Sequence, residues 1–267
     1  MSRPGGQARA AAAALSMTPV TAGTGPHDGE AAVFVDAWRA RWPEWSVAMA
    51  FVAPAQRGRV AAWGALQQAL SDAAWTGDDP TPGLAKLAWW QEELTGWTKG
   101  ARRHPLGALL QPQAVPWLAL SRALPRLQAT RLRPGEAVVD ERAWRDYAAA
   151  LAACDAALFG AGSGQGTAAG GEVAAATSPA VAVIVRTLRG ERSLLGAGAG
   201  ATATSDTPSR GGPAVVAQAG AAPVVSDLAQ PRAIHAALVD ARLGSARAPL
   251  PAWRVPWLAW RAARNAR

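Results

Sequence analysis

Thr81-Pro-Gly-Leu-Ala-Lys-Leu-Ala-Trp-Trp-Gln-Glu-Glu-Leu-Thr-Gly-Trp97 is the stretch that decides the fold of this chain. It predicts a helix that opens at Thr81 or Pro82, where a proline fits the first turn, and that continues to Gly100. The large apolar side chains recur every three or four residues and so share one helical face. They are Leu87, Trp90, Leu94 and Trp97. Glu92 and Glu93 lie off that face, so we expect a helix that packs by its leucines and tryptophans.

Helical patterns continue on both sides of this stretch. Pro43 should end the helix before it, and Pro54 fits the first turn of a long helix. A Gly-Asp-Asp-Pro turn is expected at 77–80. The other expected helices cover 31–41, 54–75, 103–111, 114–129, 139–159, 172–195, 226–243 and a last segment opened by Pro256. The chain is therefore predicted to be an all-α helical bundle.

Three segments of low complexity have no helical periodicity. Residues 1–29 are rich in Gly, Pro, Ala and Thr and are expected to form a disordered leader. Residues 160–171 and 196–222 are Gly/Ala-rich and are expected to be flexible inserts. The remaining chain, 30–267, is long enough for a single helical domain.

Composition narrows the classes of partner. The net charge is +8 and comes almost entirely from scattered arginines, without a pattern typical of nucleic-acid binding. Nucleic acid is therefore an unlikely partner. No apolar run reaches the roughly 18–20 residues of a membrane helix. Cys154 is the only cysteine, which excludes an internal disulfide and fits a cytoplasmic protein with a buried thiol.

Three segments resemble the squalene/phytoene synthase family. They are Phe51-Val-Ala-Pro-Ala-Gln-Arg-Gly-Arg-Val-Ala-Ala-Trp-Gly-Ala-Leu66, Lys86-Leu-Ala-Trp-Trp-Gln-Glu-Glu-Leu94 and Arg103-His-Pro-Leu-Gly-Ala-Leu109, in the family's order and spacing. The resemblance implies an isoprenoid-synthase-like helical bundle. It also implies head-to-head joining of two prenyl diphosphates with Mg²⁺ ions, which aspartates on two facing helices would hold. Several Mg²⁺ ions neutralise a departing diphosphate, and these cations prefer carboxylate oxygens.

The chain departs from the family pattern at both aspartate motifs. The first motif corresponds to 71–76, where only Asp72 survives and Trp75 occupies the place of a carboxylate. Asp78 and Asp79 follow in the Gly/Pro turn and are interpreted as turn residues. The best match to the second motif is 183–192, which keeps Glu191 among arginines. This degenerate pattern assigns no catalytic and no metal-ligating residue.

Two basic surfaces each allow two interpretations. The first consists of Arg186, Arg189 and Arg192, three residues apart on one helical face. It either binds a diphosphate, since guanidinium groups bind phosphate in a bidentate way, or is a solvated basic face. The second lies within 253–267 and combines Trp257 and Trp260 with Arg254, Arg261, Arg264 and Arg267. It either lies on an anionic membrane surface or docks on the bundle by its tryptophans.

Three functions are compatible with these patterns. The favoured one is a non-catalytic protein that binds a prenyl diphosphate or lipid, or serves as a scaffold or assembly factor for a protein partner, without a cofactor. The first alternative is an active Mg²⁺-dependent prenyltransferase with a site rebuilt from displaced carboxylates (Asp72, Asp78, Asp79, Glu92 and Glu93). The second is a basic module that binds membrane surfaces through 253–267, which would make a cytoplasmic protein membrane-associated.

Overall fold

The computed structural model describes residues 26–131, 141–160, 178–199, 228–245 and 248–266. Within these ranges every regular element is a helix, which confirms the all-α prediction. The long helices are α1 (Pro26–Arg41), α3 (Arg57–Trp75), α4 (Thr81–Trp97), α6 (Trp117–Ala129), α7 (Glu141–Phe159), α9 (Pro179–Ala199), α10 (Gln230–Leu243) and α11 (Val255–Asn265). The short elements are α2 (Trp45–Ala48), η1 (Met49–Phe51), η2 (Pro54–Gln56) and α5 (Gly107–Leu110).

Local chemistry sets several of the helix boundaries. Pro43 lies just beyond the end of α1 at Arg41, as expected, because a proline cannot donate the next helical hydrogen bond. Gly77 adopts a positive φ of 75° in the turn between α3 and α4. In the same turn the Asp79 carboxylate accepts a hydrogen bond from the Thr81 N–H at 2.9 Å, which lowers the pKa of Asp79. Asp79 is thus a turn residue, as interpreted from the sequence.

Some expected boundaries were wrong. Helix α1 already includes 26–29, which had been assigned to the leader, and residues 1–25 lie outside the described ranges. Helix α9 begins at Pro179 rather than at residue 172 and continues through the first four residues of the expected 196–222 insert. The rest of that insert up to residue 222, and nearly all of the 160–171 insert, are not among the described residues.

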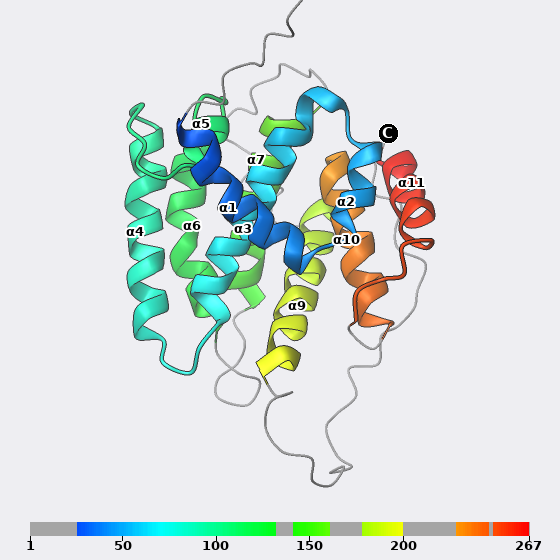
Figure 1. Ribbon diagram of the computed structural model, residues 1–267. Coiled ribbons are helices and arrows are strands. Elements are labelled where there is room, and N and C mark those ends of the chain that lie inside the picture. The colour runs from blue at the N-terminus through cyan, green and yellow to red at the C-terminus, as the bar shows by residue number, and fades with distance from the viewer. Residues whose placement is uncertain (1–25, 132–140, 161–177, 200–227, 246–247, 267) are drawn as a thin grey trace, which may run out of the picture.

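The helices pack in chain order around a tryptophan-rich core. In Figure 1, α4, α6 and α7 follow one another on one side, and α9, α10 and α11 on the other. Helix α3 packs against α4 and carries α1 across its outer face (Figure 1). The predicted stripe of α4 is buried, with Leu94 fully enclosed, and Cys154 is buried as well. No helix in the described part of the chain is both long and apolar enough to cross a bilayer.

Glu93 contradicts the expectation that both glutamates of α4 lie off the buried face. Its side chain is only 2% exposed, whereas that of Glu92 is 72% exposed. The Glu93 carboxylate accepts hydrogen bonds from the Arg103 and His104 N–H groups and from the Trp97 indole, at 2.7, 2.8 and 2.9 Å. The segment after α4 is thereby fastened to the helix.

Candidate functional site: a tryptophan- and arginine-lined pocket

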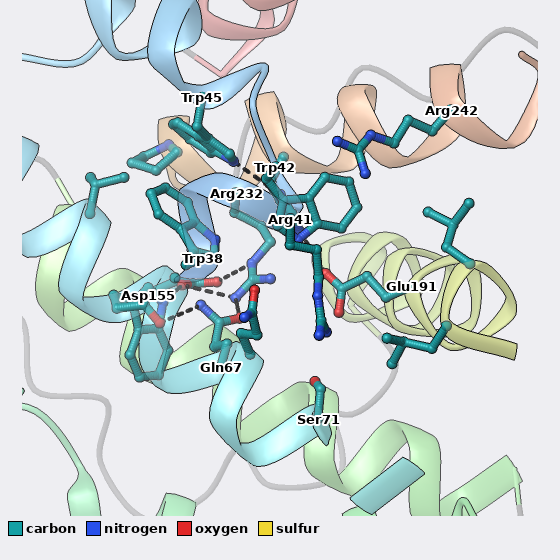
Figure 2. A pocket seen from close by; sticks show the side chains of 18 residues that line it. Trp38, Arg41, Trp42, Trp45, Gln67, Ser71, Asp155, Glu191, Arg232 and Arg242 are labelled. Carbon is teal, nitrogen blue, oxygen red and sulfur yellow. Dashed lines mark hydrogen bonds and ion pairs between the residues drawn. The ribbon is translucent and has the colours of Figure 1, made fainter. Parts of the chain in front are cut away.

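A pocket of about 240 Å³ opens between α1, α3, α9 and α10. One wall consists of tryptophan rings from the first part of the chain. These are Trp38, Trp42 and Trp45. Figure 2 shows these rings on one side and Gln67 and Ser71 of α3 on the other, with arginine side chains between them. The pocket therefore combines an apolar aromatic wall with a set of charged groups.

Asp72, the surviving aspartate of the first motif, follows the pocket residue Ser71 in the sequence and is paired with a guanidinium that lines the pocket. Arg41, at the end of α1, donates to both carboxylate oxygens, at 2.5 and 3.2 Å. Both side chains are 32% exposed, so this pair is open to solvent at the pocket edge. Trp75, where the family pattern has a carboxylate, donates its indole N–H to Thr130 Oγ1 at 2.9 Å instead.

Asp155 of α7 and Arg232 of α10 form an ion pair buried in the floor of the pocket. Arg232 Nε donates to Asp155 Oδ2 at 2.7 Å, and Trp63 Nε1 donates to Asp155 Oδ1 at the same distance. Burial alone would lower the pKa of Arg232, but Asp155 raises it, so the guanidinium stays charged. Its Nη2 also donates to the Gln67 side chain at 2.5 Å (Figure 2).

A second buried ion pair connects the segment after α1 to the end of α10. Arg242 Nε donates to Glu44 Oε1 at 2.7 Å, and the Leu250 N–H donates to the same oxygen at 2.8 Å. Burial alone would raise the pKa of Glu44, but these hydrogen bonds hold it below its ordinary value. The Arg242 guanidinium also lies over the Trp42 ring, 4.2 Å from its centroid.

Glu191, the acidic residue of the second-motif match, faces this pocket from α9. Its carboxylate oxygen lies 2.5 Å from Nε2 of His235 on α10. His235 Nδ1 accepts a hydrogen bond of 3.3 Å from the Trp45 indole, so the histidine bridges the acid and the aromatic wall. The two segments matched to the aspartate motifs, through Ser71 and Glu191, thus meet at one pocket.

The three candidate diphosphate-binding arginines of α9 do not converge on one point. Arg186 pairs with Asp240 of α10 at 2.7 Å, and Arg189 pairs with Glu141 of α7 while lying over the Trp144 ring. Arg192 donates to the Arg131 carbonyl at 2.8 Å. Each points to a different element, and none of the three lines the pocket. Diphosphate binding by these arginines stays a prediction.

Sequence reasoning missed most of the pocket, although α10 carried a usable signal. Its polar residues at positions 232, 235 and 242 follow a spacing of three and seven, which is the spacing of a buried helical stripe. Charged residues at such positions indicate a polar site rather than a plain core. Asp155 gave a similar signal, because it lies four residues after Leu151 on the buried face of α7. Nothing local indicated that Arg41 pairs with Asp72.

Within the described ranges, no three His, Cys, Asp or Glu side chains form a group that could hold a metal ion. The carboxylates at the pocket instead bind guanidinium, imidazole or indole groups. Comparison with known proteins adds no further assignment: no family model, no curated protein and no solved structure matches this chain. The resemblance to squalene/phytoene synthases therefore rests on the segments quoted above.

Proposed function

We propose that this chain is a non-catalytic relative of the squalene/phytoene synthases that binds a prenyl diphosphate or a similar anionic lipid in the pocket. The observation that carries the proposal is the bidentate pairing of Arg41 with Asp72. A guanidinium occupies both oxygens of the one aspartate that survives in the first motif. At this aspartate a guanidinium of the protein itself thus takes the place where the family would use Mg²⁺.

The shape and lining of the pocket support a single amphipathic ligand. Its volume of about 240 Å³ lies slightly below the range of typical small-molecule sites, about 300–1,000 Å³. This space suits a headgroup with the first part of a chain better than the two complete prenyl diphosphates of a condensation. The tryptophan wall offers apolar contact, and Arg41 is the most exposed guanidinium, at 32% against 3% for Arg232 and 8% for Arg242.

Arg41 and Arg39 provide a matched pair for the test. Both lie in the last turn of α1, but Arg39 is exposed, pairs with the exposed Asp36 and is not among the residues that line the pocket. The purified chain is incubated with radiolabelled farnesyl or geranylgeranyl diphosphate, with and without Mg²⁺, and both bound label and product are measured. We expect bound label without product, and binding about tenfold weaker in Arg41→Gln but unchanged in Arg39→Gln.

Each other outcome contradicts a defined part of the proposal. Metal-dependent formation of a squalene- or phytoene-type product would establish the active prenyltransferase instead. Equal binding by the Arg41→Gln and Arg39→Gln variants would show that the ligand binds outside the pocket. The absence of bound label would exclude binding of a prenyl diphosphate. The scaffold or assembly role would then be the candidate function, and the next step would be to purify the chain together with its protein partner.

A further inference from the structure

Helix α11 presents its tryptophans to solvent and not to the bundle. Trp253, in the turn before the helix, is 78% exposed, and Trp257 and Trp260 are 55% and 48% exposed. The helix docks instead by small residues on its opposite side, Val255, Ala259 and Ala263, which are at most 5% exposed. The sequence interpretation in which the tryptophans dock the helix on the bundle is therefore wrong.

The exposed tryptophans share their surface with arginines. At about 100° per residue, positions 257, 260, 261 and 264 fall within an arc of about 100°. Arg261 lies over the Trp257 ring and Arg264 over the Trp260 ring, with the guanidinium carbons 5.0 and 5.5 Å from the centroids. We call this surface the C-terminal aromatic face. Its members are Trp253, Arg254, Trp257, Trp260, Arg261 and Arg264.

Among the described residues, no carboxylate side chain forms an ion pair with an arginine of this face. The sequence contains neither Asp nor Glu after Asp240. Asp240 itself pairs with Arg186 of α9, and Glu44, which precedes the neighbouring α2, is buried against Arg242. The other large apolar side chains that are exposed lie on α1, α4, α5 and α6, whereas α11 forms the opposite edge of the bundle (Figure 1).

From this surface we infer that the chain docks peripherally on an anionic lipid bilayer through the C-terminal aromatic face, independently of any ligand in the pocket. Tryptophan rings favour the headgroup region of a membrane, and guanidinium groups bind lipid phosphates. A surface of tryptophan and arginine without acidic residues is complementary in charge to negative lipid headgroups. Because the buried side of α11 already packs on α10, the face is presented without a folding step on binding.

The test is sedimentation of the full chain with vesicles of phosphatidylcholine alone or mixed with phosphatidylserine. We expect binding to the mixed vesicles and loss of most of it at about 1 M salt, where charges are screened beyond about 3 Å. The double variant Trp257→Ala/Trp260→Ala should lower the partition coefficient more than about tenfold, because each tryptophan ring that enters the bilayer contributes apolar contact with the lipid. Arg261→Gln/Arg264→Gln should remove the preference for phosphatidylserine, by about fivefold per arginine.

Matched control variants replace exposed residues of the same kinds on other helices. Val33→Ala/Leu84→Ala on α1 and α4 and Arg122→Gln/Arg126→Gln on α6 should bind like the unmodified chain. All four double variants alter exposed side chains, so equal thermal melting verifies their folds. Equal binding to both vesicle types, or binding unchanged by the tryptophan variant, would overturn the inference. So would a dimer in sedimentation velocity that the tryptophan variant abolishes, because the occupant would then be a second copy.

Discussion

Glu92 and Glu93 are neighbours in the sequence with opposite environments. Burial alone would raise the pKa of Glu93, but the N–H groups of His104 and Arg103 hold it below its ordinary value. Next to it, burial lowers the pKa of His104 to about 4, and its ring packs against Phe34 and Trp90, with centroids 4.4 and 4.5 Å apart. These hydrogen bonds and ring contacts hold the start of segment 103–109, the third of the segments that resemble the family, against α4.

Replacing Glu93 by alanine should therefore destabilise the chain strongly. Four donors would lose their acceptor, namely the two backbone N–H groups, the Trp97 indole and the exposed Arg103 Nε. Each buried unsatisfied group costs about 1–3 kcal/mol, so we expect a loss of at least about 3 kcal/mol. Glu92→Ala is the control, because its exposed ion pair with Arg103 contributes at most about 1 kcal/mol. Urea unfolding followed by circular dichroism measures both changes. Similar losses in the two variants would show that the Glu93 hydrogen bonds do not stabilise the fold.

At the scale of elements, apolar spacing predicted the long helices well. Helices α3, α4, α6 and α7 end within three residues of the expected positions, because their buried stripes and flanking prolines act locally. Polar residues on buried faces were harder to interpret. Asp155 and Arg232 are buried as a pair that joins positions 77 residues apart, whereas Glu93 is buried under donors from the segment just after α4, ten and eleven residues further on. Periodicity identifies a buried face but does not identify the partner that makes a charge tolerable there.

The crossing of α1 over α3 depends on Gly64. A Cβ atom built there would lie 2.5 Å from the Trp38 ring, which also lines the pocket. We expect Gly64→Ala to displace Trp38 and to lower the free energy of unfolding by about 1–3 kcal/mol. In Gly58→Ala, on the same helix, the new Cβ would meet nothing within 4 Å, so this control should be neutral or more stable by up to about 1 kcal/mol.

Near-ultraviolet circular dichroism, which reports the packing of tryptophan rings, distinguishes this local effect from general unfolding. The Gly64→Ala spectrum should change at temperatures where the far-ultraviolet helix signal is intact. An unchanged spectrum and stability would mean that Trp38 moves without cost, and that the close approach of α1 and α3 is not required.

At the scale of the whole molecule, two buried ion pairs join distant parts of the chain. Asp155 and Arg232 are 77 residues apart in the sequence, and Glu44 and Arg242 are 198 apart. No pattern within either segment could predict these pairs, because they exist only after α10 has packed beside α7 and α2. The pocket is created by the same packing, which explains why the sequence predicted the bundle but not its candidate site.

Arg242→Met tests how much the longer of these connections stabilises the fold. Removing one partner of a buried pair leaves the other charge uncompensated, so we expect a loss of about 3–5 kcal/mol near pH 7. Arg126→Met is the control, because the pair of Arg126 with Asp146 is exposed and should contribute less than about 1 kcal/mol. Urea unfolding at a series of pH values measures both variants against the unmodified chain.

The pH dependence of that loss identifies the carboxylate responsible. Glu44 has a lowered pKa in the folded chain, so its stabilising effect is present above the ordinary value of 4.5 and is lost as the pH falls through the folded pKa. In Arg242→Met, burial without the guanidinium shifts the pKa of Glu44 upward, and protonation relieves the uncompensated charge. The difference in unfolding free energy between the unmodified chain and Arg242→Met should therefore narrow on acidification. A difference that stays constant below pH 4.5 would instead assign the loss to missing side-chain packing against Trp42.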